Sequence, residues 1–186
     1  MTAGRVGLMA RPLTRPELVA YGLAACYLLN DTEELITYTE SSRWLSQRLP
    51  DWLPVPQWMR DGVSQNHVNL GVALIGAYWV GAAVDGRRTG GRSVFFQDAL
   101  WAWGAHGFVH VGVSALRRGY TSGVATAPVV IGYWWWAERT LRSAGVPKLS
   151  SPPRAIGKGL AALAVAHGVA AVLERWLPDT GARLSR

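Results

Sequence analysis

The chain has 186 residues, of which 49% are hydrophobic, 17% are charged and one, Cys26, is a cysteine. Ordinary soluble domains carry about 25% charged residues, so the apolar composition excludes a disordered chain, and the single cysteine excludes a disulfide scaffold, a zinc ribbon and an iron–sulfur site. The basic residues, which give the chain a net charge of +7, lie between long uncharged runs. This distribution is typical of a membrane protein and argues against a nucleic-acid-binding surface.

The apolar runs predict an all-α, polytopic membrane helix bundle that forms one domain over residues 1–186. A membrane-spanning helix needs about 20 mostly apolar residues, and we expect five, at about residues 18–38, 68–84, 94–116, 122–137 and 156–173. Between the first two, residues 44–60 contain several Trp and Pro and are expected to form an interfacial segment. A soluble bundle is the alternative because the overall hydropathy is low for five spans, but the second and fourth runs carry no charge.

The first residues predict how the chain is inserted. Residues 1–15 contain no apolar stretch, so we expect no signal peptide and a first helix that is retained. With five spans, more Arg and Lys fall on the side of the N-terminus than on the other side. The positive-inside rule therefore predicts a multi-pass protein of the cell membrane with a cytoplasmic N-terminus.

The first run carries polar residues that need an explanation. An acidic side chain at the bilayer centre costs about 2.5–3.5 kcal/mol, and Glu33 and Glu34 lie in the second half of this run. In a helix, Asn30 shares a face with both glutamates, and Tyr27 extends that face. Either these side chains face the interior of the bundle or a wet cavity, or the helix ends near Asn30.

The third run carries His106 and His110, which lie on one face of a helix because they are four residues apart. Trp103 shares that face. Two histidines at this spacing can bind one metal ion or carry protons, and they can equally be structural residues of the bundle. His67 and His167 have no neighbouring histidine in the sequence, and we expect both to be structural.

Two motifs in this order resemble the HXXEE-domain family of small bacterial membrane proteins, which is named for a His-x-x-Glu-Glu motif. The first motif is Asn30-x-x-Glu33-Glu34, late in the first helix. The second combines His106 and His110 with a following stretch that reads Arg118-Gly-Tyr120-Thr121-Ser122-Gly123-Val-Ala-Thr126, then Pro128. Asn69 also falls where such proteins carry an Asn. The resemblance covers roughly residues 18–140.

Two residues depart from the family's pattern. Asn30 replaces the motif His, and Ser122 replaces the Pro of a Tyr-Thr-Pro-Gly turn. Asn is a poor metal ligand and neither an acid nor a base near neutral pH, so any family chemistry that uses this His is changed or lost here. The family is described as uncharacterised, so the resemblance implies an architecture and a candidate site but no reaction.

We expect the first and third helices to bring Glu33 and Glu34 together with His106 and His110. A buried carboxyl group can act as a strong acid, and aromatic rings can stabilise positive charge. This combination predicts a membrane-embedded enzyme, without a cofactor, that does acid–base chemistry on a lipophilic small molecule, for example cyclisation of an isoprenoid or epoxide. The residues expected to bind the substrate are Tyr27, Asn30, Asn69, Trp103, Tyr120 and Trp135.

Three alternatives stay open. In the first, one divalent metal ion is held by Glu33, Glu34, His106 and His110. In the second, the buried acids and histidines serve a proton-coupled small-molecule transporter, which with so few helices needs a homo-oligomer. In the third, the chain is a non-catalytic membrane scaffold. The expected partners are the lipophilic substrate and membrane lipid, with no nucleic acid.

Overall fold

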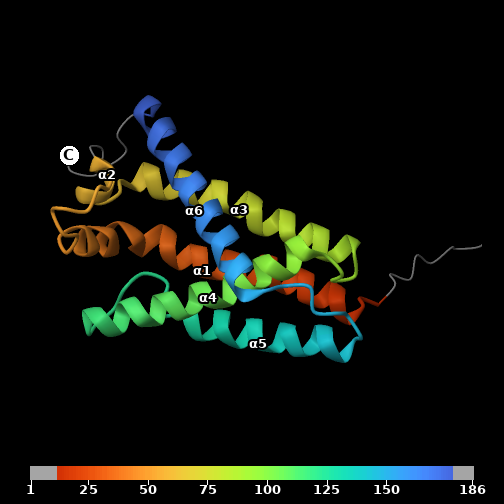
Figure 1. Cartoon of the computed structure of the whole chain (residues 1–186). Coiled ribbons are helices and arrows are strands. Elements are labelled where there is room, and N and C mark those ends of the chain that lie inside the picture. The colour runs from red at the N-terminus through yellow and green to blue at the C-terminus, as the bar shows by residue number, and fades with distance from the viewer. Residues whose placement is uncertain (1–11, 178–186) are drawn as a thin grey trace, which may run out of the picture.

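The computed structural model describes residues 12–177, and this part of the chain is helical with no strand (Figure 1). The all-α prediction is confirmed. Arg5 and Arg11, which contributed to the predicted orientation, lie outside the described residues. The elements are α1 (Arg15–Ser46), α2 (Gln57–Arg60), α3 (Gln65–Arg88), α4 (Val94–Arg117), α5 (Ala127–Ser143), α6 (Pro152–Leu173) and the 3-10 turn η1 (Glu174–Trp176).

Helix α1 is longer than predicted and continues through its polar residues. It begins at a capping box in which Thr14 and Glu17 satisfy each other's backbone N–H groups. It then runs without interruption to Ser46. The alternative in which the first helix ends near Asn30 is therefore wrong, and the polar residues stand in the middle of the helix.

Four long helices, α1, α3, α4 and α5, lie with roughly parallel axes, and α6 crosses them obliquely (Figure 1). Helix α1 packs against α3 and α5, α4 packs against α3 and α5, and α6 covers α3 and α4. The core between them is built from apolar side chains that include Leu23, Trp79, Phe96 and Leu100. This arrangement places the middle of α1 opposite the second half of α4.

A buried ion pair joins the start of α4 to α6. The Asp98 carboxylate is inaccessible to solvent and accepts hydrogen bonds from Arg154 at 2.8 and 3.0 Å and from Lys158 at 2.9 Å. Burial of Asp98 was not predicted, because an acidic residue near a helix end is inexpensive when it faces water. The pair fixes where α6 begins on the surface of α4.

Most of the long helices extend beyond the predicted spans, and α5 begins later than predicted. It begins at Ala127 rather than at residue 122, because residues 122–126 form a turn in which Gly123 has a φ of 80°. The segment expected at the interface, residues 44–60, contains the end of α1, a turn region and the short helix α2.

Two of the described helices are long and apolar enough to cross a membrane. They are α3, over Gln65–Arg88, and α6 with its following turn, over Pro152–Trp176.

Candidate active site

The polar residues of α1 are buried where the helix meets the rest of the bundle. Asn30 is inaccessible to solvent, and Asp31 and Glu34 are 5% and 9% exposed. Leu28, Leu29 and Ile36, on the same stretch of helix, are 62%, 48% and 74% exposed. The polar side of this part of α1 therefore faces inward and its apolar side faces outward, as the first of the two sequence alternatives predicted.

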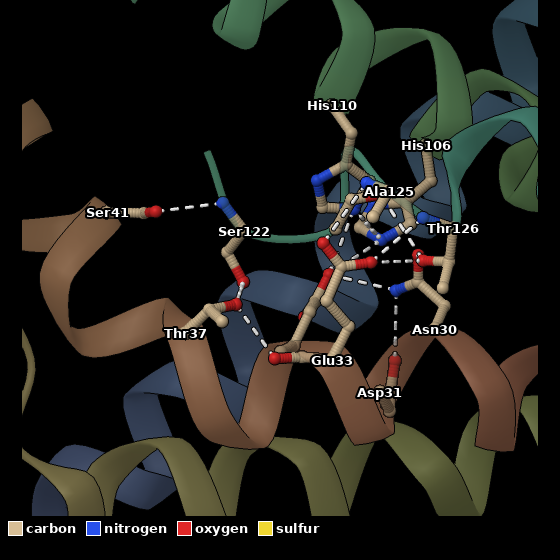
Figure 2. A network of polar contacts seen from close by, with 12 residues as sticks. Asn30, Asp31, Glu33, Thr37, Ser41, His106, His110, Ser122, Ala125 and Thr126 are labelled. Carbon is tan, nitrogen blue, oxygen red and sulfur yellow. Dashed lines mark hydrogen bonds and ion pairs between the residues drawn. The ribbon is translucent and has the colours of Figure 1, made fainter. Parts of the chain in front are cut away.

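Glu34 meets both histidines of α4, His106 and His110, whose side chains point from α4 toward α1 (Figure 2). Its Oε1 atom lies 2.9 Å from Nε2 of His110 and 3.3 Å from Nε2 of His106. The two Nε2 atoms are 2.8 Å apart. The spacing of four residues puts the two imidazoles on one face of α4, as predicted, and Glu34 reaches them from α1. We call Glu34, His106 and His110 the Glu34 centre.

Asn30 connects the Glu34 centre to Asp31. The Asn30 side-chain amide donates to Oε1 of Glu34 at 3.0 Å and to Oδ1 of Asp31 at 3.4 Å. The other carboxylate oxygen of Asp31 is buried and has no hydrogen-bond partner. Asp31 was not among the predicted site residues, although its position beside Asn30 in the sequence was the signal that could have identified it.

Glu33 does not join the histidines, so the expectation that both glutamates meet them is wrong for this residue. Adjacent helical residues point about 100° apart, and Glu33 turns toward the loop between α4 and α5. Its carboxylate accepts hydrogen bonds from Tyr120 Oη at 2.6 Å, from the Ala125 N–H at 3.1 Å, and from the N–H and hydroxyl of Thr126 at 2.9 and 2.7 Å. Glu33 therefore anchors this loop.

Tyr120 lies at this anchor and not at the Glu34 centre. Burial, together with the neighbouring Glu33 carboxylate, raises the pKa of the Tyr120 hydroxyl, so it remains a hydrogen-bond donor at neutral pH. Tyr120 therefore helps to hold the loop, and its role in substrate binding stays a prediction.

The anchored loop presses directly on His110. A Cβ atom on Gly123 would lie 2.2–2.5 Å from three atoms of the His110 ring, so only glycine fits. The Ser122 hydroxyl meets Thr37 at 2.8 Å, and the Ser122 N–H donates to the hydroxyl of Ser41 at 2.8 Å. The loop thus fixes the orientation of His110 from the side of α1.

Two of the predicted aromatic residues adjoin the Glu34 centre. Trp103 stacks on His106 with ring centroids 5.3 Å apart, and Tyr27 packs against Trp103 at 6.0 Å. The Tyr27 hydroxyl is occupied, because it donates to the backbone carbonyl of Val72 at 2.6 Å. These two rings form an apolar wall beside His106.

Asn69 and Trp135 are not brought to the centre. Asn69 is exposed and accepts a hydrogen bond from Gln65 at 2.9 Å. Trp135 is 53% exposed, and the Arg139 guanidinium lies 3.6 Å from its ring centroid. Neither contacts Glu34, His106 or His110.

A small cavity of about 80 Å³ lies between α4 and α6, and His106 is one of its lining residues. Its other walls are largely apolar and include Trp79, Ala102, Val109, Leu160 and Leu163. A larger groove of about 430 Å³ lies between α3 and α6, but its lining contains no residue of the centre.

A second group of polar residues was missed by the sequence analysis. His67 is buried, and its Nε2 atom lies 3.0 Å from Nδ1 of His167, while its Nδ1 atom lies 3.1 Å from Oε1 of Glu174. Trp58 packs against both imidazoles. We call Glu174, His67 and His167 the His67 chain. The two histidines are 100 residues apart, so no local spacing indicated that they meet.

A family model described as "Protein of unknown function with HXXEE motif" matches residues 21–137. The matched region contains most of α1, all of α2, α3 and α4 and most of α5, and therefore every residue of the Glu34 centre. No curated protein and no solved structure matches the chain.

Proposed function

The chain belongs to this HXXEE family, and from that premise we propose that it is an integral membrane enzyme that carries out acid–base chemistry on a lipophilic small molecule at the Glu34 centre. The observation that carries the proposal is the buried contact of Glu34 with two imidazoles, one of which, His106, lines a largely apolar cavity. Side chains that exchange protons are expensive to bury and concentrate at functional sites.

The membrane part of the proposal rests on where the apolar side chains lie. In addition to the two apolar helices α3 and α6, the outer surfaces of α1 and α4 present large apolar groups, with Ile36, Phe108 and Val109 at 74%, 54% and 58% exposed. Many large apolar side chains exposed on the outer surfaces of helices favour contact with a partner or a membrane. We propose that all five long helices span the cell membrane, with the N-terminus in the cytoplasm.

The acid–base part rests on the composition of the centre. A carboxylate and two imidazoles within hydrogen-bonding distance can hold and pass protons near neutral pH, since an unperturbed imidazole titrates close to pH 6.5. The loop packs against the His110 ring at Gly123, Asn30 donates a hydrogen bond to Glu34, and Trp103 stacks on His106. Because the donors are held in place before a substrate arrives, little reorganisation is needed during a proton transfer.

The lipophilic character of the substrate is inferred from the cavity. Its volume of about 80 Å³ admits only the reacting part of a molecule. The remainder of the substrate would lie on the outer surface of α4 and α6, where Val109 and Leu160 are exposed. Trp79 lines the cavity beside His106, and an aromatic ring can stabilise a developing carbocation. Cyclisation of a linear isoprenoid or its epoxide is a reaction of this class.

The test uses the purified full-length protein in lipid nanodiscs. It is incubated with a lipid extract of the source cells, supplemented with farnesol, geranylgeraniol and their terminal epoxides, and products are followed by chromatography with mass spectrometry. We expect the wild type to convert at least one component to an isomer of equal mass. Glu34→Gln should lower kcat by a factor of about 100 or more, because general acid–base catalysis contributes about 10²–10⁴.

The control is Glu40→Gln, which removes an exposed carboxylate of the same helix that pairs with Arg117. This variant should keep the wild-type rate. An extract left unchanged by the wild type, or equal rates for wild type and Glu34→Gln, would contradict the proposed function.

A further inference from the structure

We infer that the Glu34 centre binds one divalent transition-metal ion through Oε1 of Glu34 and the Nε2 atoms of His106 and His110. The inference deepens the proposed function and rests on it for its chemical meaning. The supporting observation is that these three atoms form a closed triangle, with sides of 2.8, 2.9 and 3.3 Å.

Hydrogen bonds alone cannot account for the triangle. The Nε2 atom of an imidazole either carries one proton or offers one lone pair, so it forms one in-line hydrogen bond. Every side of the triangle involves at least one of the two Nε2 atoms. At most two of the three contacts are therefore hydrogen bonds, and the third brings two lone pairs or two N–H groups together. A cation that accepts a lone pair from each atom removes this conflict.

The dimensions of the triangle match those of a metal site. Ligand atoms bonded to an ion at about 2.1 Å lie about 3.0–3.4 Å apart when their bonds make angles between 90° and 109°. The three observed distances of 2.8, 2.9 and 3.3 Å lie at or close to this range. Two histidines and one carboxylate on one side of an ion leave its other positions open, as in catalytic sites.

The charge around the triangle also favours a cation. Asp31 and Glu34 are buried within one turn of α1, and among the described residues neither forms an ion pair with Lys or Arg; the ion-pair partners of Glu34 are His106 and His110. One oxygen of Asp31 is buried without a partner. Buried negative charge is costly unless it is compensated, and a divalent ion supplies that compensation.

The neighbouring residues are arranged as in the outer shell of a metal site. Ligating histidines usually hydrogen bond through the second ring nitrogen to a backbone carbonyl or carboxylate, and ligating carboxylates are themselves hydrogen bonded. Asn30 donates to Oε1 of Glu34 at 3.0 Å, and the loop packs against the His110 ring at Gly123. A divalent ion bound at the Glu34 centre would supply Lewis-acid chemistry to the proposed function.

The experiment uses Co²⁺ as the probe, since its visible absorption reports bound nitrogen and oxygen ligands. Full-length protein in detergent is stripped with chelator, loaded with Co²⁺ and dialysed, and the bound metal is measured by elemental analysis and absorption. We expect one Co²⁺ per chain. Glu34→Gln, His106→Gln and His110→Gln should each weaken binding about tenfold or more, while the control His167→Gln should bind as the wild type does.

A second measurement needs no variant and so does not depend on folding. Diethyl pyrocarbonate modifies accessible imidazoles, and the modified residues are identified by mass spectrometry. Bound Co²⁺ should protect His106 more than fivefold and leave the reactivity of His67 and His167 unchanged. Loss of all Co²⁺ on dialysis, or protection that is the same at all histidines, would overturn the inference.

The two proposals fail in different ways. Stoichiometric Co²⁺ binding together with equal turnover by wild type and Glu34→Gln would leave the metal site standing and remove the proposed function. If turnover requires Glu34 but the protein binds no Co²⁺, the proposed function would stand and the metal site would be removed. In that case the side chains themselves would carry the protons.

Discussion

The chain buries two pairs of histidines, and the pairs are built differently. In the Glu34 centre, both imidazoles and the carboxylate direct their polar atoms at one point. In the His67 chain, Glu174 and His167 contact opposite nitrogens of His67, so the three groups lie in a line. Both groups are largely removed from solvent, so burial does not distinguish them.

The difference shows what each arrangement requires. In the His67 chain, each ring nitrogen of His67 has one partner, and one shared proton makes each of the two contacts a hydrogen bond. The His67 chain is complete as a set of hydrogen bonds and ties the start of α3 to the end of α6 and to η1. The triangle of the Glu34 centre cannot be completed by protons alone. We therefore assign a structural role to the His67 chain and a chemical role to the Glu34 centre.

The largest effect on stability is expected from Gly123→Ala, which should disrupt the Glu34 centre. The new Cβ would overlap the His110 ring at 2.2 Å, and the φ of 80° is unfavourable for alanine. A left-handed conformation and overpacking together cost about 2–4 kcal/mol. Thermal unfolding in detergent should show this loss, and Co²⁺ binding should fall with it.

Gly119→Ala is the matched control, because a Cβ at Gly119 meets no atom within 4 Å. This variant should unfold as the wild type does. Equal stability of the two variants would mean that the loop does not press on His110.

A smaller effect on stability is expected from His67→Gln, which breaks the hydrogen bonds of the His67 chain. The side chain is fully buried and holds both Glu174 and His167, so the variant leaves at least one of them without its partner. Losing a partner of a buried polar group costs about 1–3 kcal/mol. Unfolding should shift by this amount, while the turnover of the stable fraction and its Co²⁺ content stay at wild-type values. A selective loss of turnover would assign a chemical role to the His67 chain as well.

The smallest effect is expected from Asn30→His, which restores the family's motif. Asn30 lies 3.0 Å from Oε1 of Glu34, so an imidazole here would stand beside the triangle and add a nitrogen ligand. We expect Co²⁺ to bind about tenfold more tightly, or about 1.4 kcal/mol. Competition with a chelator of known affinity measures the change. Asn30→Gln keeps an amide and should show no such gain.

The sequence predicted the half of the site that depends on local geometry. The spacing of His106 and His110 placed both rings on one face of α4, and the spacing of Asn30 and Glu34 did the same on α1. It could not decide which glutamate meets the histidines, because that depends on the rotation of α1 about its axis. Packing against α3 and α5 sets this rotation, and it turns Glu34 inward and Glu33 toward the loop.

The parts that sequence reasoning missed all depend on contacts between distant segments. His67 meets His167 because α6 crosses α3, and Asp98 meets Arg154 because α6 begins against α4. The pattern of apolar and polar residues within one helix does not predict which other helix it will cross. The start of α5 was placed too early because residues 122–126 are uncharged, and their turn is dictated by Gly123 and by the contact with Glu33.

Native mass spectrometry of the detergent-purified protein tests the central claim most directly, because it weighs metal and small molecule on the same chain. Wild type and His110→Gln are compared after gentle removal of detergent. We expect the wild type to carry the mass of one divalent ion and, in part of the population, a lipophilic molecule, and we expect His110→Gln to lack the ion. Wild type that carries neither mass, or a variant that carries the same masses as the wild type, would contradict the assignment of chemistry to the Glu34 centre.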